Sequence, residues 1–138
     1  MPRDICLTIN NVAGTSLTVV ERCVWGDPEG GEWSEKDGNH VLTINGDYWQ
    51  GRGSGLIRFK EANGGLFHVV FGRGFNGNWC DLQTGLLPSE TGVKLLPEYY
   101  RSGGRFSHES HSEVTRYNSS GRTLKLVVYD DDAILEYS

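Results

Sequence analysis

The chain has 138 residues, which is enough for one compact domain and too few for a second. Its 13 Lys and Arg residues and 18 Asp and Glu residues give a formal net charge of −5, which argues against nucleic acid or anionic lipid as the main partner. The 19 glycines, together with aromatic residues at 11% of the chain, favour turns and strands over helices.

Strand patterns recur along the whole chain, each with apolar residues at a period of two. In the first of them, Ile5, Leu7 and Ile9 share one face. The other strands are predicted at 17–25, 40–44, 56–59, 66–71, 124–128 and 134–137. The acidic turn Asp130-Asp131-Asp132 separates the last two and predicts a hairpin.

Helical patterns are short. Only Asp81–Leu87 and Pro97–Arg101 are predicted to form a helical turn or two, because glycines nearby limit both. About seven or eight strands with so little helix predict an all-β fold, either an antiparallel β-sandwich or a barrel. We expect this fold to form one domain over residues 1–138.

The N-terminus and the cysteines indicate a compartment. Residues 1–7 contain neither the apolar stretch nor the cleavage site of a secretory signal. The three cysteines, Cys6, Cys23 and Cys80, are widely spaced, and their odd number predicts reduced, mostly buried thiols. We therefore expect a cytoplasmic protein.

Several motifs suggest nucleotide or metal binding and have simpler interpretations. Gly72–Gly77 matches G-x-G-x-x-G, but a dinucleotide site needs a helix next in a βαβ unit, and the surrounding sequence is all-β. His108 and His111 lie three residues apart in a polar segment without a third ligand, which favours a solvated loop. The turn at 130–132 lacks the glycine and glutamate of an EF-hand loop. We therefore predict no metal and no cofactor.

Catalytic patterns are similarly weak. The sequence contains no G-x-S-x-G element, and a pair of carboxylates such as Glu90 and Glu98 cannot be placed at a catalytic distance from sequence alone. His40 and His68 fall in strand patterns and are interpreted as half-buried structural residues. We therefore expect no catalytic residue and no enzyme activity, and a β-sandwich hydrolase is disfavoured.

Two segments combine aromatic and polar residues in the way that sugar sites do. Sugar hydroxyls need fixed donors and acceptors, and sugar C–H faces pack on aromatic rings. Asp47–Gln50 and Asp81–Thr84 both have this mixture. Trp49 is as compatible with a loop site as with packing, whereas core packing is the favoured interpretation of the other tryptophans, Trp25, Trp33 and Trp79.

A series of short motifs is shared, in order and spacing, with a known family. They are Glu21-Arg22 with Trp25, Gly30–Trp33, Val41–Thr43, Ser54–Phe59, Phe71-Gly72, Trp79–Leu82 with Thr84, Glu90–Gly92, Glu98–Tyr100 and Gly121-Arg122. Through them the sequence resembles the fungal fruit-body lectins from about Ile5 to the C-terminus. The resemblance implies an actinoporin-like antiparallel β-sandwich that binds glycans in the cytoplasm as a homodimer or homotetramer.

The resemblance implies two sugar sites. The second of them takes terminal N-acetylglucosamine, and its family residues fall on Asp81, Leu82, Thr84 and Arg105. The family also has a tyrosine there, whose matching point in this chain is Val114 or a neighbour, with Tyr117 nearby.

The first site of the family takes galactosyl-β1,3-N-acetylgalactosamine, the T antigen, and this chain departs from it. A family alanine is replaced by Pro28, and a glycine-serine-glycine loop is replaced by Gly46-Asp47-Tyr48. A His-Asn pair aligns with Gly74-Phe75, with Asn76 as the alternative asparagine. Our hypothesis is that hydrogen bonds from Asp47 and stacking on an aromatic ring rebuild a galactoside site from Pro28, Asp47, Tyr48, Trp49, Phe75 and Asn76.

The expected function is therefore a multivalent lectin that recognises the T antigen, terminal N-acetylglucosamine or both, in defence against feeding animals. The alternative is an actinoporin-like membrane-binding or pore-forming protein. Such proteins insert an amphipathic N-terminal helix of about twenty residues. This chain begins its first predicted strand at Ile5, so we expect no membrane insertion.

Overall fold

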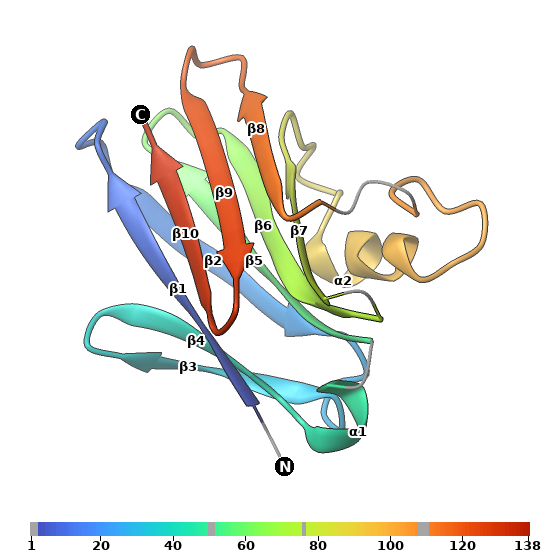
Figure 1. Cartoon of the computed structure of the whole chain (residues 1–138). Coiled ribbons are helices and arrows are strands. Elements are labelled where there is room, and N and C mark those ends of the chain that lie inside the picture. Colours follow the sequence, from blue (N-terminus) through green and yellow to red (C-terminus); the bar gives the residue numbers. More distant parts are fainter. Residues whose placement is uncertain (1–2, 50–51, 76, 108–110) are drawn as a thin grey trace.

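The computed structural model describes residues 3–49, 52–75, 77–107 and 111–138, and these residues form two packed β-sheets (Figure 1). The elements in chain order are β1 (Arg3–Asn11), β2 (Leu17–Val24), β3 (Gly31–Lys36), β4 (Asn39–Ile44), α1 (Gly46–Trp49), β5 (Gly53–Glu61), β6 (Leu66–Gly74), β7 (Gly77–Gln83), α2 (Gly92–Leu95), the 3₁₀ turn η1 (Leu96–Tyr99), β8 (Glu113–Tyr117), β9 (Thr123–Tyr129) and β10 (Asp132–Tyr137).

The strand order defines a sandwich. One sheet has six strands in the order β3-β4-β1-β10-β9-β8, and the other has four in the order β2-β5-β6-β7. Neighbouring strands run antiparallel except β1 and β10, the first and last strands, which lie side by side in parallel. The prediction of an all-β sandwich is confirmed, with this one parallel pair as its departure from a purely antiparallel arrangement.

The period of two explains how the sheets pack. On β1, Ile5 and Leu7 are fully buried between the sheets, and on β10 Ala133 and Leu135 are fully buried in the same layer. Burial of each of the larger side chains, Ile5, Leu7 and Leu135, contributes about 1.5–3 kcal/mol.

The outer face of the four-stranded sheet carries a second apolar cluster under η1. Trp25 stacks there on Tyr100 with ring centroids 4.1 Å apart, and Trp79 lies 5.1 Å from the ring of Tyr99. Trp33 packs instead between the sheets, with its indole N–H donating to the carbonyl of Cys23 at 2.8 Å. The three tryptophans thus pack against the apolar clusters, as the sequence predicts.

Some predicted elements differ from the structure. The helical turn expected at Asp81–Leu87 is wrong, because β7 continues to Gln83 and its alternate residues contact polar partners. The turn expected at Pro97–Arg101 corresponds to η1, which begins one residue earlier. Strands β3, β7 and β8 and helices α1 and α2 are absent from the prediction. The hairpin at Asp130-Asp131 is confirmed, with Asp130 at φ 50°.

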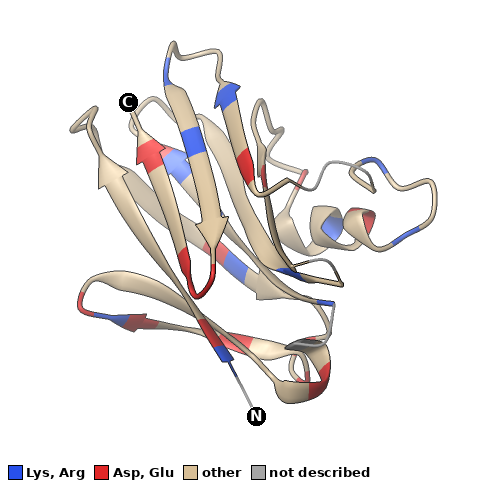
Figure 2. Ribbon diagram, in the orientation of Figure 1, with Lys and Arg blue, Asp and Glu red and all other residues tan. Residues whose placement is uncertain are grey.

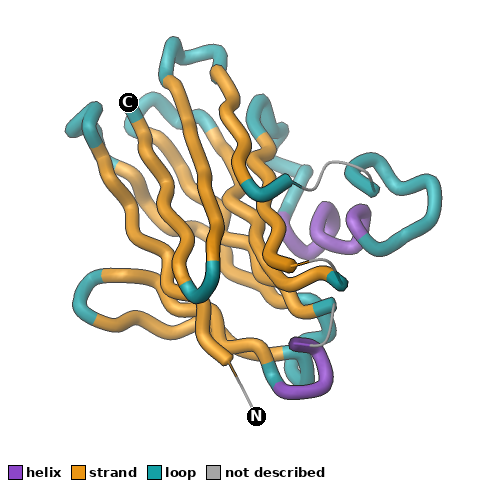
Figure 3. The backbone as a smooth tube through the Cα atoms, in the orientation of Figure 1, coloured by secondary structure: helices purple, strands orange, loops and turns teal. Residues whose placement is uncertain are grey.

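Helices and charges lie outside the sandwich core. The helical segments flank the two sheets rather than entering the layer between them (Figure 3). Basic residues mark the loop after η1, whereas the β9–β10 turn is acidic (Figure 2). Among the described residues, no helix is long and apolar enough to cross a membrane. The cysteines are free thiols, and burial raises the pKa of Cys23 and of Cys80 to about 12.

Candidate functional site

A pocket of about 220 Å³ lies where the end of β7, strand β8 and the loop after η1 meet. The residues that line it are Asp81, Leu82, Gln83, Thr84, Leu86, Arg105, Phe106 and Arg116. The four residues predicted for the second sugar site, Asp81, Leu82, Thr84 and Arg105, are all among them. The structure therefore brings these four together from a strand and from a loop more than 20 residues later, by the numbering of the chain.

Successive side chains of β7 point to opposite faces of the sheet, so they contribute to the pocket in different ways. Asp81 and Gln83 face η1, because both bond to the hydroxyl of Tyr99. Leu82 points the other way into the core between the sheets and is 2% exposed. Any contact that Leu82 makes with a ligand therefore runs through its backbone. Asp81 is 1% exposed, so its carboxylate forms the floor of the pocket.

Two donors hold the Asp81 carboxylate in place. The Tyr99 hydroxyl donates to one oxygen at 2.5 Å, and the Arg116 guanidinium lies 3.3 Å from the other. A buried carboxylate without such partners would lower the free energy of unfolding by roughly several kcal/mol. These partners fix the orientation of the carboxylate at the pocket.

A row of buried side chains continues behind Tyr99. The Gln83 amide donates to the Tyr99 hydroxyl at 2.9 Å, and the Gln83 carbonyl oxygen lies 2.5 Å from Nδ1 of His68. Nε2 of His68 lies 2.9 Å from a guanidinium nitrogen of Arg58. Arginine only donates, so Nε2 accepts and Nδ1 carries the proton. Every donor in the row therefore points toward Asp81.

Strand register builds this row. Arg58 pairs with His68 across β5 and β6, and His68 pairs with Gln83 across β6 and β7. Three side chains of adjacent strands consequently lie in line on the face under η1. Backbone carbonyls of the 87–90 loop accept the remaining Arg58 donors.

His68 is fully buried, which corrects its interpretation as a half-buried residue. Burial, with the Arg58 charge as a further contribution, lowers the pKa of His68 to about 4. The imidazole is therefore neutral near pH 7, as its acceptance of a hydrogen bond from Arg58 requires.

Arg105 reaches the pocket from the loop after η1. Its backbone N–H donates to a Glu98 oxygen at 2.8 Å, and its guanidinium pairs with Glu90 and lies 4.8 Å from the Phe106 ring centre. The Leu87 backbone N–H and Arg105 lower the pKa of Glu90. The Arg105 backbone N–H and Arg101 lower that of Glu98. These two carboxylates thus anchor the loop that carries Arg105.

Neither Val114 nor Tyr117, the candidates for the position of the family tyrosine, lines this pocket. Val114 is 5% exposed and belongs to the core, and Tyr117 is 76% exposed. Arg116, two residues after Val114, lines the pocket. The sequence prediction also missed Leu86 and Phe106, whereas Gln83 lies in the segment Asp81–Thr84 that it named. Arg116 could have been recognised from the sequence. It lies two positions after the core residue Val114 of the same strand, so both side chains point to the same face, and a guanidinium on that face needs an acidic partner.

The loops of the first predicted site meet at one end of the sandwich. The Asn45 side chain donates to the Glu29 carbonyl at 2.5 Å, which joins the β2–β3 loop to the segment that carries Asp47. Gly26, at φ 73°, leaves room for the Tyr48 ring: a Cβ there would lie 2.5 Å from it. Pro28 and Asp47 are both exposed.

The aromatic residues of the first predicted site differ in how far they are buried. Tyr48 is half-buried against the core, with the Arg52 guanidinium 5.1 Å from its ring centre. Phe75 is 90% exposed in the β6–β7 hairpin, which lies beside the start of β5 because Gly53 pairs with Arg73. The backbone of Trp49 ends α1. The side chain of Trp49 and the whole of Asn76 lie outside the described residues.

Within 3–49, 52–75, 77–107 and 111–138, no group of three His, Cys, Asp or Glu side chains is placed to hold a metal ion. His111 forms a backbone bridge with Cys80, and His108 lies outside the described residues.

Comparisons with known proteins agree with this architecture. Residues 1–135 match the family model for the fungal fruit body lectin. The chain is 37% identical to Boletus edulis lectin over 102 residues, which are 74% of this chain and 68% of that protein. The wild-type Xerocomus chrysenteron lectin XCL structure matches at a TM-score of 0.86 and 30% identity, covering 100% of both chains.

A more distant structure shares the fold alone. The lipid binding protein Nakanori matches at a TM-score of 0.64 and 10% identity, over 98% of this chain and 69% of that chain.

Proposed function

This chain belongs to the fungal fruit body lectin family of non-enzymatic carbohydrate-binding proteins, and from that premise we propose that its Asp81 pocket binds terminal N-acetylglucosamine. The observation that carries the proposal is the buried Asp81 carboxylate, which Tyr99 and Arg116 hold at the floor of the pocket. Its oxygens accept from sugar hydroxyls.

The other lining residues complement the remaining groups of a sugar. Thr84 supplies a hydroxyl, Arg105 supplies N–H donors, and the Phe106 ring supplies an apolar surface for C–H groups. Pockets for drug-sized ligands measure about 300–1,000 Å³. The smaller volume here, about 220 Å³, suits one terminal sugar residue.

We also propose a galactoside site at the loops around Asp47, with the T antigen as its ligand. Support comes from the exposed carboxylate of Asp47 on α1 and the exposed ring of Phe75 in the β6–β7 hairpin, which lies beside the start of β5. One such shallow site binds weakly, because hydroxyls exchange water for protein partners at little net gain.

Multivalency compensates for weak single sites. In a homodimer or homotetramer, linked sites raise the effective affinity by about 10²–10⁴-fold where geometry permits. The role proposed for the protein is that of a cytoplasmic agglutinin, released when tissue is damaged and directed against the glycans of feeding animals.

A glycan array with wild-type protein and the variants Asp81→Asn and Asp47→Ala tests both sites. We expect Asp81→Asn to lose terminal N-acetylglucosamine and keep the T antigen, and Asp47→Ala to do the reverse. Binding that is unchanged in both variants would contradict both sites. Wild-type protein that binds no glycan would overturn the lectin function, and dye release from sphingolipid vesicles would then test the membrane alternative.

A further inference from the structure

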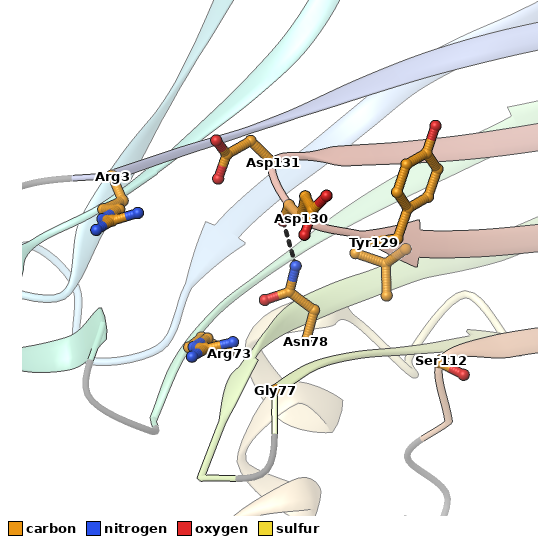
Figure 4. A pocket seen from close by; sticks show the side chains of 9 residues that line it. Arg3, Arg73, Gly77, Asn78, Ser112, Tyr129, Asp130 and Asp131 are labelled. Atoms are coloured by element: carbon orange, nitrogen blue, oxygen red, sulfur yellow. Dashed lines mark hydrogen bonds between the residues drawn. The ribbon is translucent and has the colours of Figure 1, made fainter.

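A separate cavity of about 650 Å³ lies at the end of the sandwich where the β6–β7 and β9–β10 hairpins approach the first residues of β1 (Figure 4). The residues that line it are Arg3, Arg73, Gly77, Asn78, Ser112, Val128, Tyr129, Asp130 and Asp131. None of them belongs to either sugar site discussed above. Four segments far apart in the sequence therefore build one polar hollow.

Asn78 presents an unsatisfied acceptor to this cavity. Its amide nitrogen donates to the backbone carbonyl of Asp130, which fixes the orientation of the side chain. Its Oδ1 is buried and has no hydrogen-bond partner within the described part of the chain. In Figure 4 this oxygen points toward the side of the cavity where Arg3 and Arg73 lie. A buried acceptor of this kind is normally paired, so a donor from a ligand would complete it.

The charges around the cavity cancel. Arg3 and Arg73 contribute two positive groups, and Asp130 and Asp131 contribute two negative groups. A site for an anion or a cation would carry an excess of the opposite sign. A balanced set of donors and acceptors instead suits a neutral ligand whose groups both donate and accept, and vicinal hydroxyls do both.

An apolar surface lies opposite the arginines. Tyr129 is 55% exposed and lines the cavity beside Val128, on the far side from Arg3 and Arg73 (Figure 4). Aromatic rings of this kind pack against the C–H faces of sugars. Tyr129 and Val128 thus add apolar surface to the lining of the cavity.

The size of the cavity indicates an oligosaccharide. Its volume of about 650 Å³ is about three times that of the Asp81 pocket, about 220 Å³. Arg3 and Asp131 also line an adjoining pocket of about 560 Å³, so a longer chain has room to continue past them.

We propose that this cavity is a further saccharide-binding site, which takes a neutral oligosaccharide of at least two residues. The proposal rests on the carbohydrate-binding nature of the family and is independent of the sites at Asp81 and Asp47. Asn78 Oδ1 accepts a hydroxyl, the arginines donate to sugar oxygens, and Tyr129 packs against a ring face.

Nuclear magnetic resonance of the ¹⁵N-labelled full chain tests this site. A double variant, Asp47→Ala with Asp81→Ala, serves as background, so that neither the Asp81 pocket nor the site around Asp47 contributes. The probes are four neutral disaccharides, namely galactosyl-β1,3-N-acetylgalactosamine, lactose, N,N′-diacetylchitobiose and cellobiose. We expect at least one probe to shift the signals of Gly77, Asn78, Ser112 and Asp131 together and to saturate.

Variants at the cavity then assign the contact. Asn78→Leu and, as a second variant from another segment of the lining, Ser112→Ala are each expected to weaken this binding, Asn78→Leu by about tenfold. Asn10→Leu, at an exposed position of β1, is the matched control and should leave it unchanged.

Three results would overturn the proposal. One is the absence of saturable shifts at these residues with all four probes. Another is stronger binding of sodium sulfate or calcium than of any sugar, which would make the site ionic. The third is broadening of these signals with protein concentration alone, which would make the cavity a contact between copies. Failure of either proposed sugar site leaves this test intact, because the background variant already lacks both Asp47 and Asp81.

Discussion

The two sugar sites proposed for this protein, around Asp81 and around Asp47, are built in different ways. Asp81 comes from the interior of a strand, is 1% exposed and has partners on both oxygens. Asp47 comes from a four-residue helix between strands and is exposed. The Asp81 carboxylate is thus held in place by its partners, whereas the Asp47 side chain projects from an exposed segment at the surface.

This difference has an energetic consequence. An oriented acceptor lowers the conformational cost of binding, because the side chain is already ordered. The order comes at the expense of burying polar groups, and the row from Arg58 to Asp81 keeps them paired. Substitutions in the row should therefore affect both affinity and stability, whereas substitutions in the Asp47 loops should affect affinity alone.

The largest expected effect is that of Asp81→Ala. It removes the charged acceptor at the floor of the pocket and leaves Arg116 without this carboxylate. The affinity for N-acetylglucosamine is expected to fall by about a hundredfold or more, measured by isothermal titration calorimetry. Asp81→Asn keeps the shape and separates loss of charge from loss of packing. Full affinity in Asp81→Asn would contradict the role of the carboxylate.

The second expected effect is a decrease in the free energy of unfolding at acidic pH, which is caused by protonation of His68. Burial lowers the pKa of this residue from 6.5 to about 4, so the unfolded chain takes up a proton before the folded one does. Stability from neutral His68 is complete above pH 6.5 and is lost as the pH falls toward 4. The loss amounts to about 3 kcal/mol, measured by urea unfolding at a series of pH values.

The comparison protein for this measurement is His68→Gln, whose stability should change less between pH 6.5 and 4. Burial also lowers the pKa of His40, but His40 is present in both proteins, so the difference between the two curves isolates His68. The exposed His111→Gln variant is the matched control. Parallel curves for wild type and His68→Gln would show that His68 titrates normally.

A smaller effect is expected from Tyr99→Phe. The change removes the donor to Asp81 at 2.5 Å and the acceptor of the Gln83 amide at 2.9 Å, while it keeps the ring against Trp79. The affinity for N-acetylglucosamine should fall about tenfold, and T-antigen binding should be unchanged. Tyr117→Phe, at a residue that is 76% exposed, is the control. Equal losses at both sugars would indicate a general structural effect.

The smallest effect is expected from Phe75→Ala. Loss of an exposed stacking ring should weaken T-antigen binding by about threefold to tenfold. Because Phe75 is 90% exposed, the free energy of unfolding should change by less than about 0.5 kcal/mol. Val20→Ala, at another exposed apolar position, should change neither quantity. A large loss of stability in Phe75→Ala would erase the contrast between the two sites.

The strands that the sequence predicts are those with apolar residues on the face between the sheets, such as Ile134–Tyr137 in β10. Strand β7 was missed because its outer face carries Asp81 and Gln83, which resemble loop residues until their partners are known. Those partners come from η1 and from neighbouring strands. Periodicity along one segment contains no information about them.

The residues of the candidate site were likewise predicted only in part. The resemblance to the family supplied Asp81, Leu82, Thr84 and Arg105, and the structure places all four at one pocket. It did not supply Arg116 as a pocket residue or the burial of His68. The position of His68 between Arg58 and Gln83 depends on the register of three strands. Arg116 comes from the other sheet and meets Asp81 through the packing of the two sheets.

A crystal structure of the protein soaked with N-acetylglucosamine tests the preformed Asp81 site most directly. We predict one sugar residue in the pocket between Asp81 and Arg105, with the Tyr99 hydroxyl still bonded to Asp81 and the pocket side chains unmoved. A pocket without sugar at saturating concentration, or a sugar that binds only after the Tyr99–Asp81 bond breaks, would contradict it.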